Sequence, residues 1–412
     1  MKLTNWKKVA LTWAISLALM MGYGMAQMAD AQTYSVLHNF NGGGDGANPL
    51  AGVTLDSAGN LYGTASAGGA RGCGTVYRIA ASGGAFALLY SFQGQSWGQT
   101  DGCSPYARVV FGPDGNLYGT TRAGGNGNGC RELHGCGTVF SVKPSPGTQE
   151  LVLYRFGTYD GSDPFYGDVA FDQSGNLYGT TRNGGANLQG AVYKLTPNSG
   201  PWTETVVYSF QATPDGAAPM NGVTVDTTGN LYGTTSAGGT NGWGTLFELK
   251  PSGSGWTEAV LHSFLGGSDG LTPTGNPFLD GAGHLYGATQ SGGIGAGIAF
   301  ELIPAGGGVW NLNTLYDFSG ATFGGSYRTL AMDNAGNLYG TAAADGAHQQ
   351  GSVFKLTWTN GTWVYTPLYS FTGGSDGGAP YGGLVIDANG SIYGTASAGG
   401  ANGYGVVFEI KQ

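Results

Sequence analysis

One unit of an internal repeat occupies residues 222–264 and reads GVTVDTTGNLYGTTSAGGTNGWGTLFELKPSGSGWTEAVLHSF. It contains four short segments rich in β-branched and aromatic residues, at 222–226, 230–235, 244–249 and 258–264. Such segments, separated by turns that contain Gly or Pro, are typical of β-strands. Four strands in a repeat of about fifty residues indicate one blade of a β-propeller.

The same unit recurs along the chain. The tripeptide Leu-Tyr-Gly of the second segment returns at intervals of 53 to 60 residues. Its copies begin at Leu61, Leu117, Leu177, Leu231, Leu285 and Leu338, and Ile-Tyr-Gly begins at Ile392. The first and third segments also occur seven times. The sequence therefore predicts an all-β fold, a seven-bladed β-propeller of four-stranded antiparallel blades.

The two ends of the chain are out of phase with these blades. The fourth segment ends in phenylalanine, and its copies end at Phe40, Phe92, Phe156, Phe210, Phe264, Phe318 and Phe371. The first copy precedes the first complete unit, whereas the chain ends after a third segment, at Gln412. We therefore predict that the strand Tyr34–Phe40 closes the last blade as its outer strand, because closure removes the free edges of an open array. An open solenoid is the alternative.

The composition excludes several classes of protein. Gly accounts for 81 of the 412 residues without the every-third spacing of collagen. A content of 41% hydrophobic and 12% aromatic residues argues against disorder. Only 10% of the residues are charged, and the formal net charge is −9. We expect no nucleic-acid partner, because affinity for nucleic acid depends on clustered Lys and Arg.

Residues 1–31 have the pattern of a signal peptide. Three lysines among the first eight residues precede an uncharged apolar stretch at 9–23, and the Ala-Asp-Ala sequence at 29–31 fits a cleavage site. A membrane anchor is the alternative, although the apolar stretch is short for a span. We predict that cleavage leaves a single propeller domain over residues 32–412, a secreted or periplasmic monomer without a membrane span.

Two recurring aspartate motifs mark connections between strands. Asp-x-x-Gly-Asn, as at Asp226 to Asn230, joins the first two strands, where Asp closes a turn and Gly supplies a positive φ. Asp-Gly-x-x-Pro follows the fourth strand at Asp45, Asp101, Asp160, Asp215, Asp269 and Asp376. A turn that every blade needs explains this repetition, so we expect no cofactor. A ring of carboxylates near the axis that binds calcium is the alternative.

The repeat resembles the GloVer tandem repeat of secreted bacterial proteins. The matching positions in the last unit are Tyr369-Ser370-Phe371, Asp376-Gly377, Pro380, Asp387, Tyr393-Gly394-Thr395, Gly399-Gly400 and Val407-Phe408. The resemblance is specific, because several motifs recur in a fixed order over essentially all of residues 32–412. It implies a secreted repeat protein but no particular activity. Because no anchoring domain follows the last strand, it also implies a soluble form.

Residues that break the repeat are candidates for function, because the architecture does not require them. Arg122 and Arg182 stand where other blades have a small or polar residue, and two neighbouring guanidinium groups suit a carboxylate or sulfate. Pairing with nearby aspartates is the alternative. Trp97 and Trp243, with Tyr404, lie in long loops and suit stacking on a sugar ring, with packing of the loop as the alternative.

The four cysteines all lie in the first two blades. In an exported chain an even number of cysteines implies disulfides, here with three possible pairings. Cys130 and Cys136 flank a short insertion at 131–135, so we predict a local bridge between them. The second predicted bridge then joins Cys73 to Cys103.

Two classes of function remain for a propeller with these features. We expect a non-catalytic binding scaffold, whose partner is an extracellular glycan, above all an acidic one, or another surface protein. The candidate ligand-binding residues are Trp97, Asp101, Asp160, Arg122, Arg182 and Trp243. The alternative is an extracellular carbohydrate-active hydrolase or lyase that uses carboxylates of the same loops.

Overall fold

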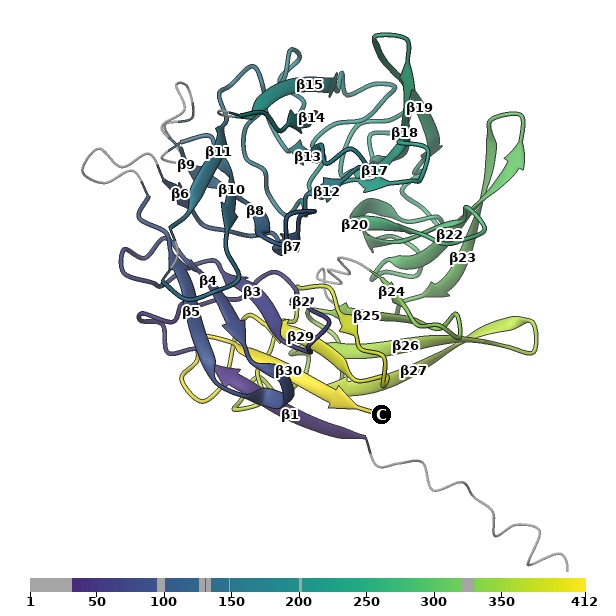
Figure 1. The fold of residues 1–412 in the computed structure, drawn as a ribbon. Coiled ribbons are helices and arrows are strands. Elements are labelled where there is room, and N and C mark those ends of the chain that lie inside the picture. The colour runs from purple at the N-terminus through teal and green to yellow at the C-terminus, as the bar shows by residue number, and fades with distance from the viewer. Residues whose placement is uncertain are drawn as a thin grey trace, which may run out of the picture.

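The structure is a computed structural model that describes residues 32–94, 101–125, 130, 135–147, 149–199, 202–319 and 330–412. The predicted signal peptide, residues 1–31, lies outside these ranges. Seven antiparallel sheets of four strands each stand around a central axis (Figure 1). The described residues contain no α-helix, and none of their helical segments is long and apolar enough to cross a membrane. The predicted fold class is confirmed.

The blades follow one another along the chain, each running from the axis outwards. Blade 1 consists of β2 (Thr54–Leu55), β3 (Leu61–Ala65), β4 (Thr75–Ile79) and β5 (Phe86–Ser91), and blade 2 of β7 (Val110–Phe111), β8 (Leu117–Thr121), β10 (Thr138–Val142) and β11 (Leu151–Arg155). Blade 3 consists of β12 (Ala170–Phe171), β13 (Leu177–Thr181), β14 (Ala191–Thr196) and β15 (Thr203–Ser209), and blade 4 of β16 (Thr224–Val225), β17 (Leu231–Thr235), β18 (Thr245–Ser252) and β19 (Gly255–Ser263).

The remaining blades have the same order. Blade 5 consists of β20 (Leu271–Leu279), β21 (Leu285–Ser291), β22 (Ile298–Gly306) and β23 (Val309–Asp317), and blade 6 of β24 (Ala331–Met332), β25 (Leu338–Ala342), β26 (Ser352–Thr359) and β27 (Thr362–Ser370). Blade 7 consists of β28 (Val385–Ile386), β29 (Ile392–Ala396), β30 (Val406–Lys411) and β1 (Thr33–Asn39). A further small ribbon pairs β6 (Gly102–Cys103) with β9 (Ala123–Gly124) in the loops of blade 2.

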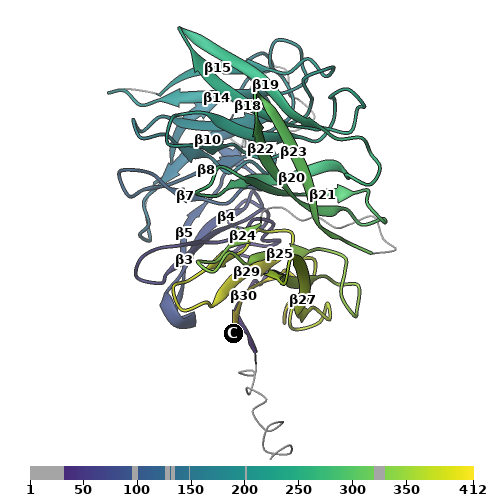
Figure 2. The ribbon, with the colours of Figure 1, turned by 90° about the vertical axis from the view of Figure 1, so that its right-hand side faces the viewer.

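The first strand of the chain closes the ring. β1 pairs antiparallel with β30, from Thr33 opposite Lys411 to Asn39 opposite Val406. Figure 2 shows the ring from the side, with the purple β1 next to the yellow β30. The predicted closure is therefore confirmed, and the open solenoid is excluded.

The hydrophobic core is divided among the blade interfaces. Seven clusters of buried side chains each combine residues of two neighbouring blades. The cluster between blades 7 and 1, for example, contains Phe40 and Val407 from one blade and Val53 and Tyr77 from the other. Because every cluster spans two blades, burial of apolar surface holds the ring together as well as each blade.

Hydrogen bonds from the Leu-Tyr-Gly-Thr motif reinforce the same interfaces. In blade 3 the hydroxyl of Thr180 donates to the carbonyl oxygen of Asn221 in blade 4, at 2.5 Å. The hydroxyl of Tyr178 donates to Asp172 in the turn between the first two strands, at 3.1 Å. The Asp-x-x-Gly-Asn aspartates therefore have the turn role that the sequence predicts.

Candidate functional site

Two sets of loops form one face of the ring. The loops between second and third strands are bridged to the loops that lead from one blade to the next, between Ala47 and Ala67 in blade 1 and between Ser162 and Asn183 in blade 3. The β6–β9 ribbon makes the same connection in blade 2. We call this side the loop face. The opposite side, which carries the hairpins between first and second and between third and fourth strands, is the hairpin face.

A small polar pocket lies where the inner strands begin around the axis. Its volume of about 30 Å³ has room for about two water molecules. Every blade contributes to its wall except the sixth, whose corresponding segment falls in 320–329, outside the described residues. The lining residues are Leu50, Ala51, Gly52, Tyr106, Arg108, Tyr166, Asp168, Asn221, Asn276, Gly382 and Gly383.

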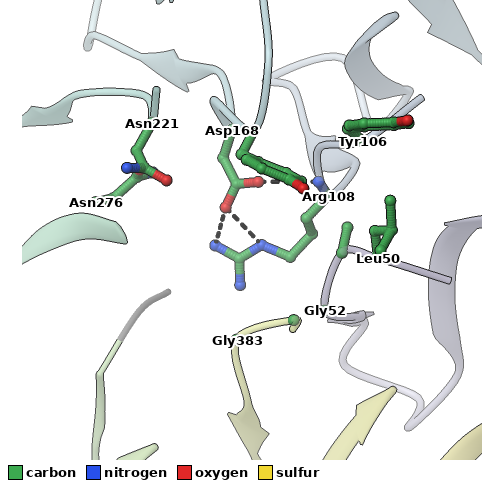
Figure 3. Close-up of a pocket in the computed structure, with 11 residues that line it drawn as sticks. Leu50, Gly52, Tyr106, Arg108, Asp168, Asn221, Asn276 and Gly383 are labelled. Atoms are coloured by element: carbon green, nitrogen blue, oxygen red, sulfur yellow. Dashed lines mark hydrogen bonds and ion pairs between the residues drawn. The ribbon is translucent and has the colours of Figure 1, made fainter. Parts of the chain in front are cut away.

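An ion pair between blades 2 and 3 forms part of the wall of this pocket (Figure 3). The Nε and Nη2 atoms of Arg108 lie 3.0 and 2.9 Å from Oδ2 of Asp168, and the Arg108 backbone N–H donates to Oδ1 at 2.9 Å. The Asp168 side chain is 14% exposed. Because both of its oxygens are engaged, the pair serves to join two inner strands rather than to present a free carboxylate.

The sequence contained a signal for this ion pair that our reading missed. The corresponding position in blades 1 and 4 is glycine, because a Cβ at Gly52 would lie 2.2 Å from the carbonyl oxygen of Gly383 and one at Gly222 would lie 1.9 Å from that of Asp168. Among the seven equivalent positions, Arg108 and Asp168 are the two charged residues, and the others are Gly, Asn or Thr. Comparison of the first-strand positions would have identified them.

The two predicted arginines meet at one buried carboxylate. Nε of Arg122 donates to Oδ1 of Asp163 at 2.9 Å, and Nη1 of Arg182 lies 3.9 Å from Oδ2. Asn183 also donates to Oδ2, at 3.3 Å. Burial raises the pKa of the Asp163 carboxyl, and the two guanidinium groups oppose that rise. The structure therefore contains the alternative arrangement, in which these arginines pair with a nearby aspartate.

Aromatic rings form the floor under both guanidinium groups. The Cζ atom of Arg122 lies 4.7 Å from the ring centre of Phe165, and that of Arg182 lies 5.2 Å from the same centre. Phe165 contacts Tyr106 and Tyr166, with ring centres 5.5 and 4.2 Å apart, and both tyrosines line the axial pocket. The arginines thus lie at the rim of that pocket, on the loop face of blades 2 and 3.

The charges of this cluster do not balance. Arg122 is 27% exposed and Arg182 is 39% exposed, whereas Asp163 is 2% exposed. Two guanidinium groups share one carboxylate, and the Nε atom of Arg182 has no hydrogen-bond partner in the described structure. Among the described residues, a chain with a net charge of −9 therefore carries a local excess of positive charge here.

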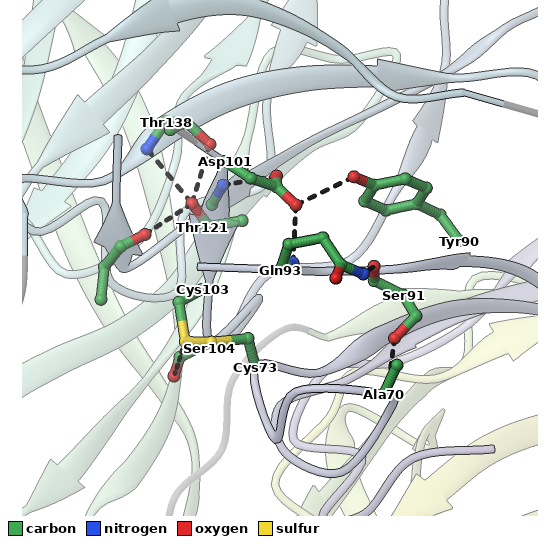
Figure 4. The surroundings of a disulfide bond; sticks show 12 residues. Ala70, Cys73, Tyr90, Ser91, Gln93, Asp101, Cys103, Ser104, Thr121 and Thr138 are labelled. Carbon is green, nitrogen blue, oxygen red and sulfur yellow. Dashed lines mark hydrogen bonds between the residues drawn. A yellow bond between two sulfur atoms is a disulfide. The ribbon is translucent and has the colours of Figure 1, made fainter. Parts of the chain in front are cut away.

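The repeated loop aspartates hold their own loops. Asp101 accepts hydrogen bonds from the hydroxyl of Tyr90 at 2.9 Å and from the backbone N–H of Gln93 at 2.6 Å (Figure 4). Asp160 accepts the equivalent bonds from the hydroxyl of Tyr154 and the N–H of Gly157. Because these tyrosines belong to outer strands, the carboxylates do not converge on the axis as a calcium ring would require. In the described ranges, no group of three His, Cys, Asp or Glu side chains has an arrangement that could hold a metal ion.

Three of these aspartates face a glutamate of the next blade. Glu150, Glu204 and Glu258 stand six residues before the phenylalanine that ends the outer strand, and they lie beside Asp101, Asp160 and Asp215. Burial and the neighbouring aspartate raise the pKa of Glu150 to about 10 and those of Glu204 and Glu258 to about 7.

Other blades show that this position is structural. In blades 1 and 7 it holds Phe86 and Tyr34, whose rings stack on His38 and Tyr369 of the preceding blade. The glutamates therefore fill a packing position between blades, where one oxygen of each is buried without a hydrogen-bond partner.

The aromatic residues of the loops serve packing. Trp243 and Tyr404 lie against glycines of adjacent loops, because a Cβ on Gly266 would come within 2.5 Å of the indole and one on Gly42 within 2.6 Å of the phenol. Their exposed fractions are still 46% and 44%. Trp97 lies outside the described residues.

Both predicted disulfides are present, Cys73–Cys103 and Cys130–Cys136. Cys73 occupies the repeat position of Trp243 and lies against the equivalent glycine, Gly94 (Figure 4 shows the bridge). A covalent bond in blade 1 therefore holds the loop that an aromatic ring covers in blade 4. Structural disulfides are typical of oxidising compartments, so the two bridges indicate a protein that is exported from the cytoplasm.

The comparison with protein families gives one match. The model of the Gloeobacter/Verrucomicrobia repeat matches residues 20–240 and 167–408, two overlapping regions that cover most of the chain. The chain belongs to this repeat family. The comparison with curated proteins found no match.

Several solved structures are similar to this family member at low sequence identity. The extracellular domain of a hybrid two-component system from B. thetaiotaomicron is 13% identical with a TM-score of 0.53, and the match covers 91% of this chain but 39% of that one. A candidate gluconolactonase is 10% identical with a TM-score of 0.44, covering 93% and 92% of the two chains. A candidate glucose dehydrogenase from Thermus thermophilus is 16% identical with a TM-score of 0.45, covering 74% and 96%.

Proposed function

We propose that this member of the Gloeobacter/Verrucomicrobia repeat family is an exported, monomeric, non-catalytic scaffold that binds an acidic glycan on the loop face of blades 2 and 3. Export would follow cleavage after residue 31. The observation that supports the site most strongly is the shared carboxylate: Asp163 pairs with Arg122 at 2.9 Å, and within the described ranges Arg182 has only one ion pair, at 3.9 Å.

The geometry favours a carboxylate ligand at Arg182. Its side chain is 39% exposed and its guanidinium lies over Phe165, so an incoming uronic-acid carboxylate meets a planar pair of donors on an aromatic floor. Asp163 is too deeply buried to compete for solvent-facing donors of Arg182. The exposed ring of Tyr159, 80% accessible in the same loop as Asp163, offers an apolar surface for the sugar itself.

The described site gives less support to a hydrolase or lyase. Asp101 and Asp160 accept hydrogen bonds that hold their loops, and Asp168 is engaged by Arg108. Glu150 beside Asp101 has the raised pKa of a general acid, but its place is a packing position.

The test compares two arginines of the loop face by calorimetric titration with an oligouronate. Arg182→Ala should weaken binding at least tenfold and reduce its dependence on salt, because a charge-assisted contact contributes roughly 1.5–3 kcal/mol. Arg71→Ala removes the same charge from an exposed loop of blade 1, and it should change the affinity less than twofold. Equal affinities for wild type and Arg182→Ala would exclude this site.

A further inference from the structure

The hairpin face carries a groove that is independent of the loop-face site. The outer hairpins of blades 5 and 6, β22–β23 and β26–β27, have strands of eight or nine residues, whereas those of blades 1 to 3 have five to seven. In Figure 1 these two long hairpins belong to neighbouring blades and project outward from the ring. Between them lies a groove of about 930 Å³, which is large enough for several sugar rings.

A pair of tryptophans forms one wall of this groove. Trp358 and Trp363 stand opposite each other across the β26–β27 hairpin, with ring centres 5.6 Å apart. Trp363 belongs to the repeat, since Trp256 and Trp310 occupy its position in blades 4 and 5. Trp358 does not, and its side chain is 57% exposed.

The other blades show what Trp358 replaces. Pro251 and Pro304 hold its position in blades 4 and 5, and each is paired with the tryptophan opposite. The hairpin therefore forms with proline at this position, and the fold does not require an indole there.

The floor of the groove carries an excess of negative charge. Nδ1 of His284 lies 3.1 Å from Oε1 of Glu301 and 3.6 Å from Oδ2 of Asp280. Tyr286 donates to Oε1 of Glu301 at 2.8 Å, and Asn313 donates to Oε2 at 3.4 Å. Two carboxylates therefore share one imidazole, which leaves the floor negative whether or not the histidine is protonated.

This charge also departs from the repeat. Glu248 and Glu409, at the position of Glu301 in blades 4 and 7, are each paired with a lysine two residues later, at 2.8 and 3.5 Å. In blade 5 that later position is Ile303. His284 in turn stands where most blades have the asparagine of the Asp-x-x-Gly-Asn turn. Three departures from the repeat thus meet in one groove.

From this convergence we propose that the groove between blades 5 and 6 binds an amino sugar with a free ammonium group. Its ammonium lies against Glu301 and Asp280, and the apolar face of its ring lies on Trp358, where a cation is also attracted to the indole. The lining of the groove includes the side chains of Asn313 and Thr314, which suit a ligand with many hydroxyl groups. These groups favour a saccharide over a lysine-rich peptide.

The experiment titrates the protein with a tetrasaccharide of β-1,4-linked glucosamine and with its fully N-acetylated form. We expect the free amine to bind at least tenfold more tightly than the acetylated form. Trp358→Pro, which installs the residue of the repeat, and Glu301→Gln should each weaken binding at least tenfold. Arg182→Ala should leave it unchanged, so that failure of this site and failure of the loop-face site are distinguishable.

Three outcomes would overturn the proposal. One is the absence of measurable binding of the amine. Another is equal binding of the two tetrasaccharides, or of wild type and both groove variants. The third is binding of an oligolysine peptide at Glu301 without binding of the amino sugar, which would assign the groove to a protein partner. Circular dichroism melting of Trp358→Pro serves as the check that this variant is folded.

Discussion

At the scale of single residues, adjacent positions of the repeated motif have different structural roles. In blade 3 the leucine of Leu-Tyr-Gly-Thr is buried between blades, the tyrosine holds a turn and the threonine bonds to the next blade. The glycine permits close approach, since a Cβ at Gly179 would lie 2.3 Å from the hydroxyl oxygen of the fully buried Tyr193. Each position of the motif thus has a separate physical requirement.

The first prediction concerns this glycine. Gly179→Ala should lower the free energy of unfolding by about 1–3 kcal/mol, because the buried ring of Tyr193 must shift to admit the methyl group. The matched control is Gly281→Ala, where a Cβ meets no atom within 4 Å and which should change stability by less than about 0.5 kcal/mol. Denaturant unfolding measures both, and equal stability of the two variants would contradict the role of the glycine.

The structural roles of the recurring residues could be assigned from the sequence, whereas the partner of Arg122 and Arg182 could not. The roles of the turn and loop aspartates followed from their repetition. Asp163 was not singled out, because it occupies a variable position of Asp-Gly-x-x-Pro, where other blades have Asn48 or Ala218. Only the fold brings it under Arg122 and Arg182, which precede and follow it by 41 and 19 residues along the chain.

At the scale of strands and blades, the number of strands was predicted better than their lengths. The segment 222–226 forms a strand only at Thr224–Val225. The inner strands start where segments of neighbouring blades crowd around the axis, and this crowding leaves backbone contacts such as that between Gly52 and Gly383 in place of a longer ladder. Such contacts join residues that are far apart in the sequence, so a local sequence pattern does not predict them.

Ionisable side chains at the blade interfaces lead us to expect that stability depends on pH. Folding raises the pKa of Glu204 and Glu258 from 4.5 to about 7, so their contribution to stability is complete below pH 4.5 and is lost as the pH rises through 7. For Asp172, burial opposes ionisation, but hydrogen bonds from Asn176 and Tyr178 outweigh it and lower the pKa. Aspartates of this kind contribute stability above pH 3.8 that is lost on acidification.

We therefore predict a higher melting temperature at pH 5.5 than at pH 8.5. The double variant Glu204→Gln, Glu258→Gln should reduce this difference and raise the melting temperature at pH 8.5 by roughly 1–3 °C, since it removes two carboxylates that ionise next to aspartates. Differential scanning calorimetry at the two pH values measures the effect. A wild-type protein that is more stable at pH 8.5 than at pH 5.5 would contradict this prediction. So would a double variant with the same pH dependence as the wild type.

Closure of the ring gives a prediction for a single strand. Removal of residues 32–40 should expose the edge of β30 and delete the buried ring of Phe40, with a loss of at least about 3 kcal/mol from that side chain alone. A synthetic peptide of residues 32–40 added to the truncated chain should raise its melting temperature, because it can pair again with β30. A truncated chain as stable as the full one would contradict closure by β1.

At the scale of the whole molecule, each face of the ring carries one local excess of charge among the described residues. The loop face carries the excess guanidinium of Arg182 near the axis, and the hairpin face carries the excess carboxylates of Asp280 and Glu301 near the rim. Repetition in the sequence predicted the ring and the closing strand, and the even number and spacing of the cysteines predicted the disulfides. Both proposed sites rest on departures from repetition, whose chemistry became interpretable only once the fold had placed them beside one another.

The most direct test of the proposed scaffold is a single titration that records binding and turnover together. An oligouronate is titrated into the protein in a calorimeter, and the sugar recovered from the cell is then sized by mass spectrometry. We predict heat of binding with the oligosaccharide recovered intact, and loss of that heat in Arg182→Ala but not in Arg71→Ala. Shortened or unsaturated fragments that are absent from a protein-free control would identify a hydrolase or lyase and contradict a non-catalytic scaffold.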